Sequence, residues 1–133
     1  MKTILLVTMM IFTGAVSSAD SFTKADLERW QGEFDATAKY GRDLWTNSAK
    51  VKLGTNGVAC AQCHPNGANT HPETYPKFQK QLGKVATVWE MMNWCIRNPL
   101  QGKNLAADSK EMIAMQAYIM KERKGVKIEP GKH

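Results

Sequence analysis

Apolar residues recur every three or four positions in three stretches of the chain, and this pattern predicts three helices. The first stretch covers 23–45, with Leu27, Trp30, Phe34, Ala38, Gly41 and Leu44 or Trp45 at helical spacing. Because these positions form one stripe on a helix, we expect the stripe to pack into the core. A glycine weakens a helix, so Gly41 predicts that another helix crosses closely at that point.

Two further helices are expected in the second half of the chain. Thr87 and Glu90 have the spacing of a capping box, and this helix should end before Pro99, which cannot continue a helical hydrogen-bond ladder. Asp108 and Glu111 have the same spacing and predict the start of the last helix, which runs to about residue 123. The long segment 65–83, rich in Pro, Gly and Asn, is expected to be irregular. The fold class is therefore all-α.

The N-terminus has the pattern of a secretory signal peptide. Lys2 gives a positive start, residues 4–16 are almost wholly apolar, and Ser17-Ser18-Ala19 suits signal peptidase. We expect residues 1–19 to be removed and 20–133 to form one domain in the periplasm, with no membrane span after cleavage. An uncleaved N-terminal anchor is the alternative, which the small residues at 17–19 disfavour.

The chain is basic, with a formal net charge of +6. The late part of the sequence holds many of these cations: Lys121, Arg123, Lys124, Lys127 and Lys132. Such a face can steer an acidic redox partner or anionic substrates toward the protein, although a solvated tail would have the same composition. Nucleic acid is not an expected partner in this compartment.

The motif Cys60-Ala61-Gln62-Cys63-His64 predicts covalent attachment of one haem c. Two cysteines at this spacing can form thioethers with one haem, and the next histidine can then bind the iron. A thioredoxin-like site would need a βαβ pattern, whereas this pattern is helical. A zinc site formed by Cys60, Cys63, Cys95 and His71 is the other alternative, but it leaves His64 without a role.

Cys95 is the third cysteine of the chain and has no partner left after haem attachment. A lone thiol in an oxidising compartment needs burial, a metal or another molecule. No methionine occurs between Pro99 and Ser109, where many cytochromes place their second iron ligand. Cys95, Met91 and Met92 all remain candidates for that position. His71 follows His64 too closely to reach the opposite face easily, and His-Pro in a loop suggests ordinary surface.

The order of helices around the motif matches a class I cytochrome c, with Gly41 and Tyr118 at the crossing of the first and last helices. Within this class the chain resembles the haem domain shared by SoxA and thiosulfate dehydrogenase. The resemblance covers roughly 41–119 and is carried by Tyr75-Pro76, Asn93-Trp94-Cys95, Gly102-Lys103-Asn104-Leu105, Asp108-Ser109-Lys110-Glu111-Met112 and Ala117-Tyr118-Ile119.

The resemblance implies that Cys95 is the distal haem ligand, which fits both electron transfer and sulfur chemistry. This chain has Asn98 where the family commonly has an arginine, with Arg97 one position earlier. The family's dehydrogenases also carry a second haem domain, whereas this sequence has one Cys-x-x-Cys-His motif.

We therefore expect an electron-transfer subunit that works with a second cytochrome c in thiosulfate oxidation. A thiosulfate dehydrogenase-type enzyme, in which Cys95 is catalytic and Lys103 and Arg97 lie near the anions, is one alternative. A haem sensor for small ligands is the other.

Overall fold

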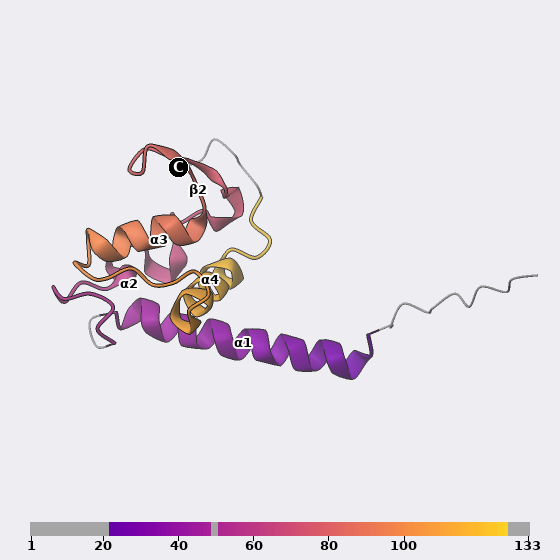
Figure 1. Cartoon of the computed structure of the whole chain (residues 1–133). Helices are drawn as coiled ribbons and strands as arrows, with labels where there is room; N and C mark the ends of the chain where they lie inside the picture. The colour runs from indigo at the N-terminus through magenta and orange to yellow at the C-terminus, as the bar shows by residue number, and fades with distance from the viewer. Residues whose placement is uncertain (1–21, 49–50, 128–133) are drawn as a thin grey trace, which may run out of the picture.

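A computed structural model describes residues 22–48 and 51–127 of the chain, so the expected signal peptide and Lys132 lie outside the described residues. Most of the described regular structure is helical, in line with the all-α prediction. The elements in chain order are α1 (Lys24–Thr46), α2 (Cys60–Cys63), the 3-10 turns η1 (Pro65–Gly67) and η2 (Pro72–Thr74), β1 (Lys77–Gln79), β2 (Lys84–Ala86), α3 (Val88–Arg97) and α4 (Lys110–Glu122). In Figure 1, α1 lies along the bottom of the view, α4 crosses it, and α3 and the two strands lie above.

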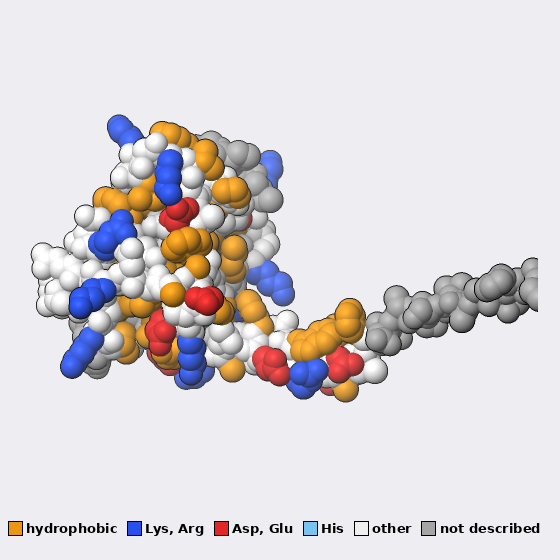
Figure 2. Space-filling model, viewed as in Figure 1, with side chains coloured by type: hydrophobic (Ala, Val, Ile, Leu, Met, Phe, Trp, Pro, Cys, Tyr) orange, Lys and Arg blue, Asp and Glu red, His pale blue; other side chains and the backbone are white. Residues whose placement is uncertain are grey.

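The first helix begins as the sequence predicts but extends away from the rest of the domain. Thr23 caps it, since its hydroxyl accepts from the Asp26 N–H at 3.1 Å while the Asp26 carboxylate accepts from the Thr23 N–H. The expectation that its whole apolar stripe is buried is wrong. Leu27 is 54% exposed and Phe34 is 41% exposed, and hydrophobic side chains are visible on the projecting arm in Figure 2. The stripe enters the core only from Ala38 onward.

The crossing of α1 and α4 confirms the prediction made from Gly41. A Cβ atom added at this glycine would lie 1.8 Å from the Ala114 carbonyl oxygen and 2.9 Å from the Tyr118 Cβ. Tyr118 is 2% exposed, and its ring packs against Trp45 with the ring centroids 5.9 Å apart. The two helices therefore approach so closely that a hydrogen atom is the largest substituent that fits without a shift.

One hydrophobic core joins the buried parts of α1, α3 and α4. From α4 it takes Met112 and Met115, which are 0% and 1% exposed, and from α3 it takes Ile96, which is 2% exposed. The other buried members are Leu44, Trp45, Leu53, Met92, Leu100, Ala114, Tyr118 and Ile119. Because α2 and the loops pack over this cluster, the core also forms the floor of the site described below.

The start of α3 follows the prediction, while that of α4 is shifted by one residue. The Glu90 carboxylate accepts from the Thr87 N–H at 2.8 Å, and α3 ends at Arg97, ahead of Pro99. The N-cap of α4 is Ser109, whose hydroxyl accepts from the Met112 N–H at 3.2 Å. The predicted cap at Asp108 was therefore wrong, because the serine hydroxyl takes that role.

The segment 65–83 is more ordered than its composition suggests. Its end forms β1, which pairs antiparallel with β2 in the register Lys77 with Ala86, Phe78 with Val85 and Gln79 with Lys84. The expectation of an irregular segment is wrong for this hairpin. Each strand has only three residues, and Gly83 at φ +66° sits in the turn between them.

Candidate functional site

A cavity of about 860 Å³ lies above the core and brings together the residues of the predicted haem site. Cys60, Cys63, His64 and Cys95 all line it, as do both alternative ligands, Met91 and Met92. The rest of its wall is largely apolar, with Trp45, Val88, Trp94, Ile96, Leu100, Met115 and Ile119 among the lining residues. A cavity of this size and composition suits a large planar apolar group, because binding pockets usually have volumes of about 300–1,000 Å³.

The histidine of the motif is held in a defined orientation. His64 follows α2 and leaves the helical conformation, with φ −128° and ψ 68°. Its ring Nδ1 lies 2.9 Å from the Ala68 carbonyl oxygen, so that nitrogen donates when it carries the proton. Nε2 is then the lone-pair nitrogen, which is the form in which histidine binds a metal. The Trp45 Nε1 donates to the His64 carbonyl oxygen at 2.9 Å and ties this turn to α1.

Ser48 fixes the first cysteine and was not identified from the sequence. It is fully buried, its hydroxyl accepts from the Cys60 N–H at 3.2 Å, and its oxygen lies 3.3 Å from the Cys60 Sγ. Burial raises the pKa of the Cys60 thiol, although the hydrogen bond with Ser48 opposes this rise. A single serine after a helix gives no sequence signal for this role, because the contact forms only when the following loop brings Cys60 back to Ser48.

Cys95 reaches the cavity from the last turn of α3. Burial raises the pKa of its thiol to about 11, and the nearby charges of Cys60 and Cys63 add to the rise. Cys95 is therefore a neutral thiol at neutral pH in the metal-free chain, and metal binding would have to displace its proton. All three cysteines are among the residues that line the cavity.

Asn93 positions the helix that carries Cys95. Its side-chain amide donates to the Leu105 carbonyl oxygen at 2.9 Å and accepts from the Leu105 N–H at 2.9 Å, while the residue is only 2% exposed. This paired contact holds the loop 98–109 against α3. The resemblance quoted Asn93 as part of a motif, but its physical role appears only in the fold, because Leu105 is twelve residues away.

A second set of contacts joins the loop before the haem motif to the residues that follow α3. The Thr55 N–H donates to the Leu100 carbonyl oxygen at 2.9 Å, and the Asn56 side chain donates to the Pro99 carbonyl oxygen at 2.6 Å. These bonds fix the loop that leads to Cys60 relative to the helix of Cys95. The two halves of the candidate site are thus held together by one backbone–backbone hydrogen bond and one from a side chain to the backbone.

The residues proposed for anion binding do not face this cavity. Arg97 donates to the Asn104 side chain at 2.7 Å, and the Asn98 side chain donates to the Trp94 carbonyl oxygen at 2.8 Å. Neither of them lines the cavity, nor does Lys103. Two other cations, Lys77 and Lys80, do line it, and both were missed because they lie in the segment expected to be irregular.

His71 is not an ordinary surface residue, contrary to the expectation. It is 5% exposed, and its Nδ1 lies 3.1 Å from the Glu73 Oε1 and 3.1 Å from the Arg123 guanidinium. Its ring does not line the cavity that holds the cysteines. Across residues 22–48 and 51–127, no three side chains of His, Cys, Asp or Glu lie together as a metal site would need. The zinc alternative, which requires His71 beside the cysteines, is therefore not supported.

The same contacts account for part of the basic C-terminal region. Arg123 pairs with Glu73 at 3.1 Å, and Lys121 pairs with Asp35 of α1 at 2.6 Å. These two cations therefore serve contacts within the chain. A docking role for the remaining basic residues stays a prediction.

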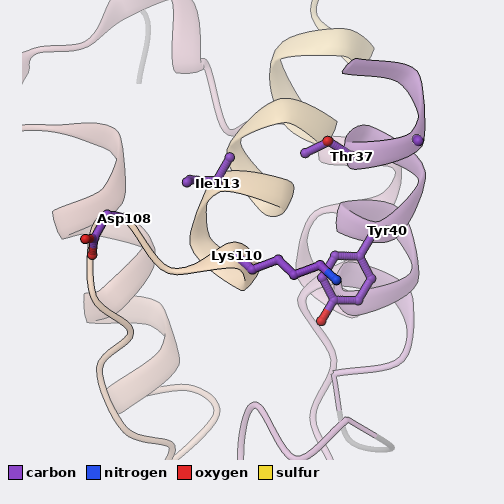
Figure 3. Close-up of a pocket in the computed structure, with 6 residues that line it drawn as sticks. Thr37, Tyr40, Asp108, Lys110 and Ile113 are labelled. Atoms are coloured by element: carbon purple, nitrogen blue, oxygen red, sulfur yellow. The ribbon is translucent and has the colours of Figure 1, made fainter. Parts of the chain in front are cut away.

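A second hollow, at the junction of α1 and α4, lacks the residue types of the candidate haem site. Its lining residues include Thr37, Tyr40, Asp108, Lys110 and Ile113, and it contains no cysteine or histidine. The Lys110 side chain extends toward the Tyr40 ring (Figure 3), with its Nζ 4.9 Å from the ring centroid. This is a surface cation–π contact, and no cysteine, histidine or methionine lines the hollow.

The fold and the cavity define the class of protein. A Cys-x-x-Cys-His turn and a further thiol line one apolar cavity, and the porphyrin of a haem would supply the remaining iron ligands itself. The residues present therefore fit a covalently bound haem, and the class is a c-type cytochrome. A sequence model described as "SoxA/TsdA, cytochrome c domain" matches residues 40–128, more than half of the chain. The chain belongs to this family.

Named proteins that are similar to the chain agree with its membership of this family. The chain is 31% identical to a thiosulfate dehydrogenase of Psychrobacter arcticus, in an alignment covering 65% of the chain and 30% of that protein. It is 33% identical to the L-cysteine S-thiosulfotransferase subunit SoxA of Rhodovulum sulfidophilum, covering 74% of the chain and 39% of that protein. A thiosulfate dehydrogenase of Allochromatium vinosum is 29% identical over 55% of the chain.

The matched region is only part of each relative. The chain spans 30% and 39% of the lengths of the first two relatives. The shared part is the cytochrome c domain, and such a domain implies covalently bound haem c. No helix within the described residues has the length and apolar character needed to cross a membrane.

Proposed function

We propose that this chain is a periplasmic c-type cytochrome that transfers electrons in the oxidation of thiosulfate or a related sulfur compound, together with a second cytochrome c. Cys60 and Cys63 hold one haem c by thioether bonds, and His64 and Cys95 are the ligands of its iron. The observation that carries the proposal is that all four residues line one cavity of about 860 Å³. Export is proposed from the pattern of residues 1–19.

Bound haem c supplies a one-electron couple held in an apolar environment. The chain's own residues prepare that environment. The Ala68 carbonyl oxygen keeps the proton of His64 on Nδ1. Ser48 holds the backbone of Cys60, while Asn93 fixes the helix of Cys95. Buried Met115 and Ile119 exclude water from the floor of the cavity.

Intact mass and visible spectra test the attachment and the ligands. The purified chain should carry the mass of one haem, and Cys60→Ala with Cys63→Ala should remove covalent haem. The Cys95→Ser variant should keep covalent haem but lose the thiolate features of the ferric spectrum. Met91→Leu and Met92→Leu are the matched controls, because both residues line the same cavity from the same helix. If the spectrum of Cys95→Ser is unchanged and that of one methionine variant changes, the methionine is the ligand.

A thiosulfate dehydrogenase-type activity is the second candidate. It is favoured by the relatives that carry that name and by the half-buried Cys95 thiol facing the cavity. Joining two thiosulfate ions releases two electrons, whereas one haem accepts one. We therefore expect slow turnover by the chain alone and faster turnover when a second cytochrome c is added. Rapid thiosulfate-dependent reduction of ferricyanide by the purified chain, lost in Cys95→Ala, would favour the dehydrogenase activity over the electron-transfer role.

A further inference from the structure

The turn that follows the haem motif, residues 65–71, runs through strained backbone. Asn66, Asn69 and His71 have φ angles of 51°, 59° and 45°, in the left-handed region, and Gly67 between them has a φ of 68°. Residues other than glycine rarely adopt this region, although asparagine and histidine do so more often than most. Such backbone keeps its shape only when surrounding contacts hold it. The strained turn therefore needs an anchor.

The strained turn carries the hydrogen bond that orients the proposed iron ligand. The Ala68 carbonyl oxygen, which lies 2.9 Å from the His64 Nδ1, belongs to it. The Ala68 N–H donates to the Pro65 carbonyl oxygen at 2.9 Å, so this oxygen moves only when the turn moves. A histidine that donates its second ring N–H is a more basic metal ligand through the other nitrogen. The place of the strained turn thus sets the basicity of the His64 Nε2.

The anchor is a cluster of three side chains at the end of α4. The Arg123 Nη2 donates to the Glu73 Oε1 at 3.1 Å and lies 3.1 Å from the His71 Nδ1. The side chains of Glu73 and Arg123 are only 12% and 19% exposed, and His71 is buried. None of the three lines the cavity that holds the cysteines. One guanidinium nitrogen therefore fixes the residue at which the strained turn ends and a residue just beyond it.

We propose that Arg123 positions the iron ligand His64, acting through His71 and the strained turn. This rests on the proposed function, in which His64 binds the haem iron. Without Arg123 the Glu73 carboxylate loses its cation, and a largely buried charge without a partner is strongly destabilising. The carboxylate then turns toward solvent and draws the strained turn with it. The hydrogen bond from His64 to the Ala68 oxygen weakens as a result.

Reduction potentials of the holoproteins test this assignment. Arg123→Ala should raise the potential, because a less basic His64 stabilises ferric iron less. The equilibrium for reduction should shift by about threefold or more, which corresponds to ~28 mV for one electron. Lys121→Ala is the matched control, because it removes a cation from the same end of α4, where Lys121 pairs with Asp35 of α1. Loss of a cation alone disfavours reduction, so its potential should stay unchanged or fall slightly.

Two further variants separate positioning from loss of the fold. Arg123→Lys should keep most of the wild-type potential, since a single nitrogen makes both contacts. His71→Asn removes the contact with Arg123 through a shorter side chain, while asparagine still tolerates the left-handed backbone. Its potential should rise, and amide hydrogen exchange over residues 65–74 should be faster than in the wild type. This variant decides the question if Arg123→Ala does not hold haem.

Several results would overturn the assignment while leaving the proposed function intact. One is a folded Arg123→Ala holoprotein whose potential equals that of Lys121→Ala or lies below it. Another is faster amide exchange in Arg123→Ala or His71→Asn without a rise in potential, because Arg123 would then only stabilise the turn. A third is an unchanged potential in His71→Asn when Arg123→Ala does not fold. A wild type without covalent haem would instead contradict the proposed function, and the assignment with it.

Discussion

Gly41 of α1 and Ala114 of α4 are in backbone contact, since a Cβ built on Gly41 would lie only 1.8 Å from the Ala114 carbonyl oxygen. This contact sets the separation of the two main helices. Beyond it, Met115 and Ile119 of α4 reach the floor of the cavity. The geometry of the candidate haem site therefore depends on a glycine that does not touch it.

We expect Gly41→Ala to destabilise the fold by about 3 kcal/mol, because the new methyl group would meet backbone that cannot rotate away. Gly32→Ala is the matched control in the same helix, where nothing lies within 4 Å of an added Cβ. It should stabilise the protein by about 1 kcal/mol, since alanine favours helix over glycine. Urea denaturation of both holoproteins checks the opposite signs. Equal effects of the two substitutions would contradict the close crossing.

Asn93→Ala should cost about 3 kcal/mol of unfolding free energy. The change leaves the half-buried N–H and carbonyl oxygen of Leu105 without their partner, and each such loss typically costs about 1–3 kcal/mol. Asn98→Ala, on the exposed end of the same helix, should change stability by about 0.5 kcal/mol or less. Denaturation curves give both values. A small effect of Asn93→Ala would mean that the loop 98–109 is held by other contacts.

Structural features that depend only on residues close together in the chain could be predicted from the sequence. The starts of α1 and α3 follow from Thr23 with Asp26 and from Thr87 with Glu90, because capping acts within one turn. The Cys60–His64 motif is also local, and its two cysteines and its histidine line one cavity. The cap of α4 was misplaced by one residue because Asp108 and Ser109 are both good caps.

Other features depend on contacts across the chain and could not be predicted from local pattern. Periodicity identified the apolar side of α1, but it does not say whether another element covers Leu27 and Phe34. The β1–β2 hairpin has strands of three residues, too short for an alternating pattern to be distinctive. The burial of His71 depends on Arg123, which lies more than fifty residues further along.

The contact between Glu73 and Arg123 predicts a specific acid sensitivity. Burial raises the pKa of Glu73, but the hydrogen bonds from Arg123 and His71 and the charge of Arg123 outweigh this and hold the pKa at about 2, below the ordinary 4.5. A carboxyl group whose pKa is lower in the folded state stabilises that state above the unfolded pKa. This stabilisation is lost as the pH falls from about 4.5 to about 2.

The Glu73→Gln variant should therefore be less stable than the wild type at pH 6, and the difference in unfolding free energy should shrink as the pH is lowered toward 2. Glu28→Gln is the matched control, because Glu28 pairs with Lys24 at 3.5 Å on the exposed surface of α1. Surface pairs contribute little, so its difference from the wild type should stay small at every pH. Urea titrations of the three holoproteins between pH 6 and pH 2 measure both differences. A Glu73→Gln difference that stays constant over this range would show that the carboxylate is not stabilised by Arg123 in the folded chain.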